Sequence, residues 1–181
     1  MVRKILVVVD DRPVTQSAID HAIEVAQVHR ADIFFYCVLP RYDYPVSDML
    51  AVVYVTAETF QAEAAKEAAR LLAAASAWAE RCGVLSHQGT STAADAAQAV
   101  ADAAAKRHCD LIVVGTDEQN AVVRLLSGSI VPGLISKATV PVLVCKDRSL
   151  VANRGSGLRR PFEHRSPKRE SGTPDEPELD D

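Results

Sequence analysis

The segment from Gly115 to Ser129 holds the residue types with the clearest capacity for ligand chemistry. It follows the apolar run Leu111–Val114, and its last two residues, Gly128 and Ser129, lead into a predicted helix. A glycine after a strand lets the backbone turn and approach a ligand without a Cβ in the way. A Gly-Ser step at a helix start presents backbone N–H groups, a hydroxyl and the positive end of the helix dipole. The segment therefore predicts a loop that holds a phosphate group.

Two acidic residues in this segment weaken the phosphate interpretation. Asp117 and Glu118 both lie inside it, and two unit charges ~4 Å apart interact by roughly 4 kcal/mol at an effective dielectric constant of 20. Arg124 is close enough in sequence to neutralise one of these charges, and a bound Mg²⁺ would turn the carboxylates into ligands. The alternative is a plain strand-to-helix connection in which the glycines serve only the turns.

Asp10 and Asp11 form a second candidate group, directly after the first apolar run. A carboxylate at a strand end either hydrogen-bonds a ligand or caps the following helix, and the sequence allows both roles. No Ser-His-Asp or Cys-His arrangement can be assembled from the sequence, and the segment after Gly115 contains no Walker lysine. We therefore expect no catalytic residues and at most slow ATP hydrolysis.

The cysteines and histidines predict no metal site. The four cysteines include no C-x-x-C pair and lie in or beside apolar segments, which is typical of buried free thiols. The five histidines show no ligand spacing such as H-E-x-x-H.

The segments around these candidate residues alternate regularly between predicted strands and predicted helices. Short apolar runs bounded by turn residues predict five strands, at 5–9, 32–39, 84–88, 111–114 and 140–145. Longer segments predict helices that run to about Arg30, from 57 to 82, from 94 to 108 and from 129 to 137. Helix ends are expected near Pro13, Gly83 and either Thr92 or Asp95, and Gly89 is expected to close the third strand in a turn. The segment 40–57 is compatible with a lid, an extra strand or the first turns of the next helix.

This alternation predicts an α/β fold with a single doubly wound, five-stranded parallel sheet and helices on both faces. Right-handed crossovers leave few topologies, and the strand order 3-2-1-4-5 is the one we expect. In such Rossmann-like sheets ligands bind beyond the carboxyl ends of the strands, where the strand order reverses. The first and fourth strands meet at that point, which places Asp10 and Gly115 in one predicted crevice.

The order and spacing of several short segments resemble the universal stress protein family. Those segments are Lys4–Asp10, Ser17–Ala22, Gly89 before a helix, Asp110–Thr116, Leu125–Ile130 and Ala138–Val144. Each is weak alone, but together they are specific and cover residues 2 to about 146. The resemblance implies a regulatory module of the stress response that binds ATP or AMP. The alternative is a dimeric interaction protein of the same fold that binds no nucleotide.

The nucleotide-binding branch of that family carries a loop of pattern G-x₂-G-x₉-G-[ST]. Gly115, Gly128 and Ser129 fit this pattern, whereas Glu118 stands where the family has its middle glycine. The resemblance implies that Asp10 hydrogen-bonds an adenosine group, that the Val38 backbone meets the adenine and that the loop and helix start contact phosphates. The binding residues that it implies are Val9, Asp10, Val38, Val114, Gly115, Glu118, Gly128, Ser129 and Ile130.

Composition changes abruptly after residue 146. Seven basic residues and one acid occupy 148–169, and six acids without a base occupy 170–181. With the interspersed glycine, serine and proline, this pattern predicts a globular domain at 1–146 and a disordered, charge-blocked tail at 147–181. The tail is either a partner-binding arm or a solvated extension.

The remaining sequence features argue against nucleic-acid-binding, membrane-spanning and secreted proteins and suggest an oligomeric state. The net charge of −4 argues against a nucleic-acid partner, because backbone binding needs a clustered basic field. No apolar run approaches the ~18 residues of a membrane span, and no signal-peptide pattern is present, so we expect a cytoplasmic protein without a membrane partner. The last strand, at 140–145, is an apolar edge candidate, and edge strands invite pairing. A homodimer through this edge is therefore expected.

Overall fold

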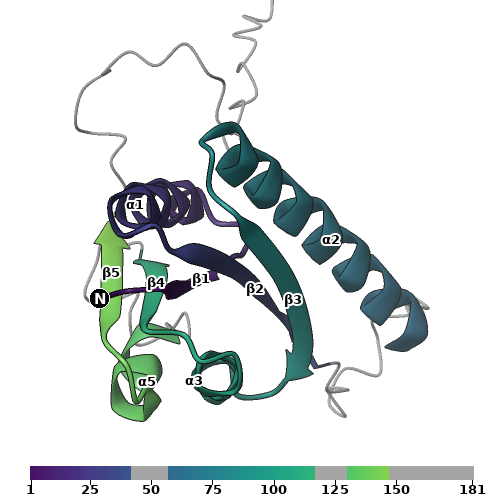
Figure 1. Ribbon diagram of the computed structural model, residues 1–181. Helices are drawn as coiled ribbons and strands as arrows, with labels where there is room; N and C mark the ends of the chain where they lie inside the picture. The colour runs from purple at the N-terminus through teal and green to yellow at the C-terminus, as the bar shows by residue number, and fades with distance from the viewer. Residues whose placement is uncertain (42–56, 117–129, 147–181) are drawn as a thin grey trace, which may run out of the picture.

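Five parallel strands form one sheet in the computed structural model, which describes residues 1–41, 57–116 and 130–146. The order across the sheet is β3-β2-β1-β4-β5 (Figure 1), and all four neighbouring pairs are parallel. The strands are β1 (Lys4–Val8), β2 (Asp32–Pro40), β3 (Ser86–Ala93), β4 (Leu111–Thr116) and β5 (Val142–Lys146). The predicted fold class and the predicted strand order are both confirmed.

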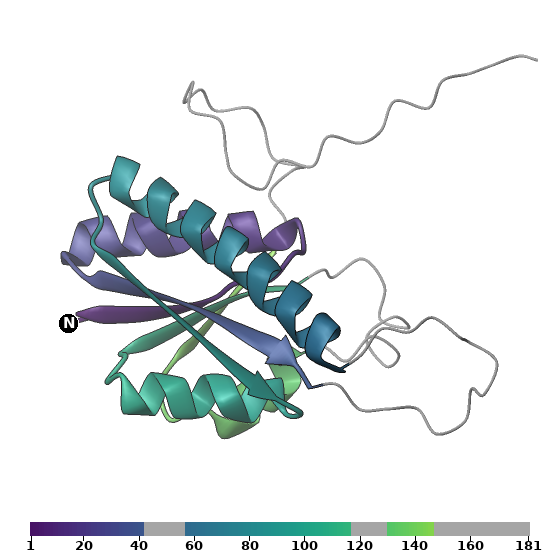
Figure 2. The same ribbon diagram turned by 90° about the vertical axis from the view of Figure 1, so that its right-hand side faces the viewer.

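Helices cover both faces of the sheet, as a doubly wound fold requires. Helices α1 (Val14–His29) and α2 (Ala57–Arg81) lie on one face, and α3 (Ala96–Lys106) and α5 (Ile130–Lys137) lie on the other (Figure 2). Among the described helices, none is long and apolar enough to cross a membrane.

The strand sequences are apolar throughout because each strand is buried on both sides. Successive side chains of a strand point to opposite faces, and β1 shows the consequence directly. Ile5 and Val7 belong to the core layer under α1 and α2, whereas Leu6 and Val8 belong to the layer under α3 and α5. A strand with polar residues at alternate positions would leave one of these layers unfilled.

The helix ends follow local chemistry that the sequence indicates. Pro13 stands at the start of α1, Gly83 adopts a φ of +72° after α2, and the Asp95 carboxylate accepts a hydrogen bond from the Gln98 N–H to cap α3. Arg30 ends α1 in the left-handed conformation with a φ of 55°, which is uncommon for a residue with a Cβ. The expected ends at Pro13, Gly83 and Asp95 are confirmed.

The third strand is the main error in the predicted elements. It begins at Ser86 and continues through Gly89 to Ala93, paired with β2 along its whole length, so the expected turn at Gly89 is wrong. The glycine instead leaves room for the Phe34 ring, because a Cβ on it would lie 2.6 Å from Cζ of Phe34. The residues of β3 are mostly polar because it is an edge strand whose side chains are half-buried or exposed.

Smaller shifts affect the other elements. The fourth strand continues to Thr116, two residues beyond the predicted end, and the fifth begins at Val142 rather than at 140. The second strand ends at Pro40 and α2 begins at Ala57. Most of the segment 40–57, whose conformation the sequence left open, lies outside the described residues.

Candidate functional site

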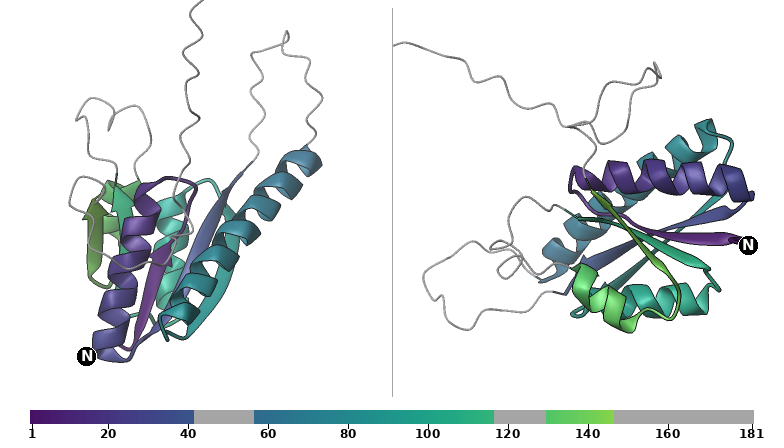
Figure 3. Two further views of the ribbon diagram at one scale, coloured as in Figure 1. Left: turned by 90° about the horizontal axis from the view of Figure 1, so that it is seen from above. Right: turned by 90° about the vertical axis from the view of Figure 1, so that its left-hand side faces the viewer.

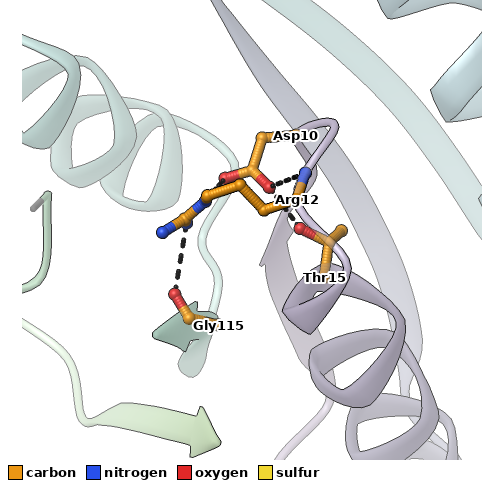
Figure 4. Close-up of polar contacts among 4 residues, drawn as sticks. All are labelled: Asp10, Arg12, Thr15 and Gly115. Carbon is orange, nitrogen blue, oxygen red and sulfur yellow. Dashed lines mark hydrogen bonds and ion pairs between the residues drawn. The ribbon is translucent and has the colours of Figure 1, made fainter. Parts of the chain in front are cut away.

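The Arg12 guanidinium group links the carboxyl ends of the neighbouring strands β1 and β4. Asp10 follows β1 and Gly115 lies near the end of β4, its neighbour in the sheet. Arg12 Nη2 donates to Asp10 Oδ2 at 2.6 Å and to the Gly115 carbonyl oxygen at 3.2 Å (Figure 4). We call Asp10, Arg12, Thr15 and Gly115 the strand-end site. It lies where the strand order reverses, the position at which open parallel sheets bind ligands.

The Asp10 carboxylate accepts four hydrogen bonds within this site. Its Oδ1 accepts from the Arg12 backbone N–H at 3.1 Å and from the Thr15 hydroxyl, and its Oδ2 accepts from Nε of Arg12 at 2.9 Å and from Nη2. An ionised carboxylate offers about four acceptor positions. The side chains of Arg12 and Asp10 are 33% and 30% exposed. Asp10 therefore fixes the connection between β1 and α1 while staying within reach of solvent.

Arg12 is the residue that sequence reasoning missed. In the sequence it stands between the candidate pair Asp10 and Asp11 and the helix start at Pro13. A basic residue two positions after a strand-end aspartate is the signal that could have identified it, because that spacing lets a guanidinium fold back onto the carboxylate with two N–H donors. The sequence gives no sign of its contact with Gly115, which is 103 residues away.

Gly115 is a glycine because a helix packs against it. The residue is buried inside β4, and a Cβ built on it would lie 2.9 Å from Cγ1 of Val14 and 3.0 Å from the Val14 carbonyl oxygen. The expectation that Gly115 leaves the strand is wrong, since the strand continues through Thr116. Close approach of α1 explains the absent side chain, and the Gly115 carbonyl is left as the group that faces Arg12.

The other predicted binding residues occupy different environments. Val9 and Val114 are 1% and 0% exposed, in opposite core layers, so their side chains are committed to packing. Val38 and Ile130 are half-buried at the layer under α3 and α5. Three further residues, Glu118, Gly128 and Ser129, lie outside the described residues, and with them most of the predicted phosphate loop.

The end of β2 forms a second boundary of this region. Pairing between β1 and β2 runs as far as Tyr36, whose carbonyl accepts from the Val9 N–H at 2.9 Å. Strand β2 continues to Pro40, paired on its other side with β3. Val38 therefore lies on a length of backbone that extends past the end of β1, beside Asp10 in the fold.

The carboxylates after β1 affect the pKa of the Cys37 thiol on β2. Burial, together with the negative charges of Asp10 and Asp11, raises the pKa of Cys37 to about 11. Burial also raises the pKa of Cys109 to about 11. All four cysteines are free, and three of them are buried as predicted, whereas Cys82 is half-buried. Within the described ranges, no group of three or more His, Cys, Asp or Glu side chains is placed to hold a metal ion.

A groove of about 550 Å³ lies elsewhere, between α3 and the strands β2 and β3. The Arg107 guanidinium lies 5.0 Å from the centre of the Phe34 ring, and the Tyr36 hydroxyl donates to Oγ of Ser91 at 2.6 Å. Neither Asp10 nor Gly115 lines this groove. Its volume falls within the range of small-molecule pockets, but the strand-end site carries the stronger convergence of charged groups and fold position.

Comparisons with known proteins agree on one family. The family model described as the universal stress protein family matches residues 1–146. A solved universal stress family protein from Burkholderia pseudomallei is 26% identical with a TM-score of 0.62, and the match covers 78% of this chain and 93% of that chain. No protein in the curated set matches.

Two other similar structures carry nucleotides. The universal stress protein from Archaeoglobus fulgidus in complex with dAMP is 22% identical with a TM-score of 0.55, and the match covers 81% of this chain and all of that chain (100%). A family protein from Arabidopsis thaliana with AMP bound is 16% identical with a TM-score of 0.59, and the match covers 81% of this chain and 93% of that chain.

Proposed function

Because the chain belongs to the universal stress protein family, we propose that it is a regulatory module that binds an adenine nucleotide, ATP or AMP, at its strand-end site. The observation that carries this proposal is the meeting of Asp10, Arg12 and Gly115 at the reversal of strand order. A carboxylate accepts hydrogen bonds from ligand hydroxyls, and a guanidinium pairs with phosphate oxygens. The site thus offers both kinds of group that a nucleotide needs.

The similar structures support the adenine class of ligand. Their bound ligands are dAMP in the archaeal protein and AMP in the plant protein. At 22% and 16% identity these structures share the fold with this chain, and we propose the adenine ligand for this chain by analogy. The contacts that we propose are hydroxyl binding by Asp10, adenine contact at the Val38 backbone, and phosphate contact near Gly115 and at the start of α5.

Titration calorimetry of the dialysed protein with AMP and ATP tests the proposal, with GTP as the control ligand. Gly128→Asp adds a side chain and a negative charge where the family pattern puts phosphate, and we expect it to reduce affinity at least tenfold, which is ~1.4 kcal/mol. Ala105→Asp is the matched control, because it adds the same group at an exposed position of α3. Unchanged affinity in folded Gly128→Asp protein would contradict the proposal.

A second function is favoured by two observations. The acceptor positions of Asp10 are already occupied by Arg12 and Thr15, and Glu118 replaces the middle glycine of the family loop. Both features fit a dimeric interaction protein that binds no nucleotide. Mass spectrometry of small molecules released from freshly purified protein separates the two functions: an adenine nucleotide supports the first, and dimers that release none support the second.

A further inference from the structure

The groove between α3 and the strands β2 and β3 has an aromatic floor. Phe34 and Tyr36 on β2 both line it, and the centres of their rings lie 5.7 Å apart. Several of the residues around the two rings have small side chains or none, namely Gly89, Ser91, Ala93, Ala99 and Ala103. A space of about 550 Å³ therefore remains beside the rings, and it is large enough for a planar molecule of two fused rings.

Two basic residues at the end of α3 line the same groove. The Arg107 guanidinium carbon lies 5.0 Å from the centre of the Phe34 ring, and Lys106 precedes it. Within residues 1–41, 57–116 and 130–146, neither of these cations forms an ion pair. Basic residues in the last turn of a helix also complement its dipole. That effect accounts for the positive charge but not for a guanidinium placed over a ring that lines a groove.

The two carboxylates that line the groove have partners inside the domain. Asp95 pairs with Lys137 and accepts from the Gln98 backbone N–H, and Asp102 accepts from Gln98 Nε2 at 2.9 Å. The two cations at the end of α3 have no such carboxylate partner in the described part of the chain. The groove thus presents positive charge beside an aromatic surface, which is the combination that an aromatic anion needs.

We propose that this groove is a second binding site, and that its ligand is a small aromatic carboxylate. The ligand ring packs against Phe34 and Tyr36, and such aromatic pairs gain energy beyond the area that they bury. The ligand carboxylate pairs with the Arg107 guanidinium and with Lys106 through charge-assisted hydrogen bonds, which are stronger than neutral ones. This inference is independent of the nucleotide proposal, because no residue of the strand-end site lines the groove.

Titration calorimetry with 2-naphthoate tests the site. The neutral control ligand is 2-naphthamide, which keeps the two rings and replaces the carboxylate with an amide, and we expect the acid to bind about tenfold more tightly. Arg107→Gln should lower this preference to about twofold, whereas Arg107→Lys keeps the charge and should keep more of the preference. Arg81→Gln is the matched control variant, because Arg81 ends α2 on the other face of the sheet and lies 4.8 Å from the centre of the Trp78 ring.

A second pair of variants tests whether the ligand lies in the groove. Ala99→Leu adds bulk to the groove wall and should weaken both ligands, whereas Ala105→Leu adds the same side chain at an exposed position of α3 outside the groove and should change neither. Arg107 is exposed, so the charge test does not depend on how well Ala99→Leu folds.

Four results would overturn the proposal. The first is the absence of 2-naphthoate binding at about millimolar concentration. The second is a preference for the acid that Arg107→Gln leaves unchanged. The third is unchanged binding in Ala99→Leu protein that melts like the unchanged protein, since the ligand then lies elsewhere. The fourth is displacement of 2-naphthoate by AMP, which would place the ligand at the strand-end site.

Discussion

At the scale of single residues, the strand-end site combines a polar contact with a packing constraint. The Gly115 carbonyl accepts from Arg12, while its Cα lies against the first turn of α1. The same glycine thus permits α1 to approach β4 and leaves a backbone oxygen facing the charged pair. A side chain at this position would disturb the packing and the polar contact together.

We expect Gly115→Ala to lower the free energy of unfolding by about 1–3 kcal/mol, as overpacking usually does. The new Cβ would meet the Val14 backbone, which cannot escape by a change of rotamer. Gly89→Ala is the comparison, because the new Cβ there meets the far end of the Phe34 ring, which can shift. Urea denaturation should show the larger loss for Gly115→Ala. An equal or smaller loss would show that α1 adjusts without cost.

At the scale of elements, a polar contact ties the two helices on each face of the sheet. Trp78 Nε1 on α2 donates to Asp20 Oδ1 on α1 at 3.1 Å, and Lys137 on α5 pairs with Asp95 at the start of α3. The second contact matters for the site, because α5 begins with Ile130, directly after the segment that the family pattern assigns to phosphate. Asp95 thus caps α3 and holds the far end of α5.

Asp95 should make the stability of the α3–α5 pair depend on pH. Its hydrogen bond with Lys137, followed by the Gln98 N–H, lowers the pKa of the carboxyl below its ordinary value of 3.8. The resulting stabilisation is present above the unfolded pKa and is lost as pH falls through the lower folded pKa. Asp95→Asn keeps a cap acceptor but cannot ionise, so the difference in melting temperature from the unchanged protein should shrink between pH 5 and about pH 2. A pH-independent difference would contradict the ion pair.

At the scale of the whole molecule, the sheet has two different edges. Strand β5 forms the edge beside α5, and β3 forms the opposite edge (Figure 3). The apolar side chains Val142 and Val144 on β5 are half-buried, whereas β3 carries serine, threonine and histidine. An apolar edge strand is the more favourable surface for pairing with a second copy.

We therefore propose a homodimer through β5 and predict that Val144→Lys weakens it. The charge would enter the pairing surface, and light scattering should show a shift from dimer to monomer at equal concentration. Thr90→Lys places the same side chain on the exposed edge strand β3 and should leave the dimer intact. A dimer that survives Val144→Lys places the interface elsewhere, and an unchanged protein that is monomeric at all concentrations rejects dimerisation.

Patterns in the amino-acid sequence were enough to predict the fold class and which strands are neighbours in the sheet. Continuous apolar runs such as Ile5–Val9 can be buried only in a sheet covered on both faces, and handed crossovers leave few strand orders. These are local patterns combined with general rules, so one sequence was enough to predict the order 3-2-1-4-5. The position of Asp10 beside Gly115 followed from the same order.

The hydrogen bonds of the strand-end site and the extent of the polar strand β3 could be known only from the folded protein. The bond from Arg12 to Gly115 and the contact of Gly115 with Val14 join residues about a hundred positions apart, and no local pattern encodes such distances. The length of β3 was missed for a related reason: an edge strand is stabilised by pairing with β2 rather than by its own hydrophobicity. Backbone pairing and close packing are properties of the assembled chain, so they become visible only when the strands and helices are in place.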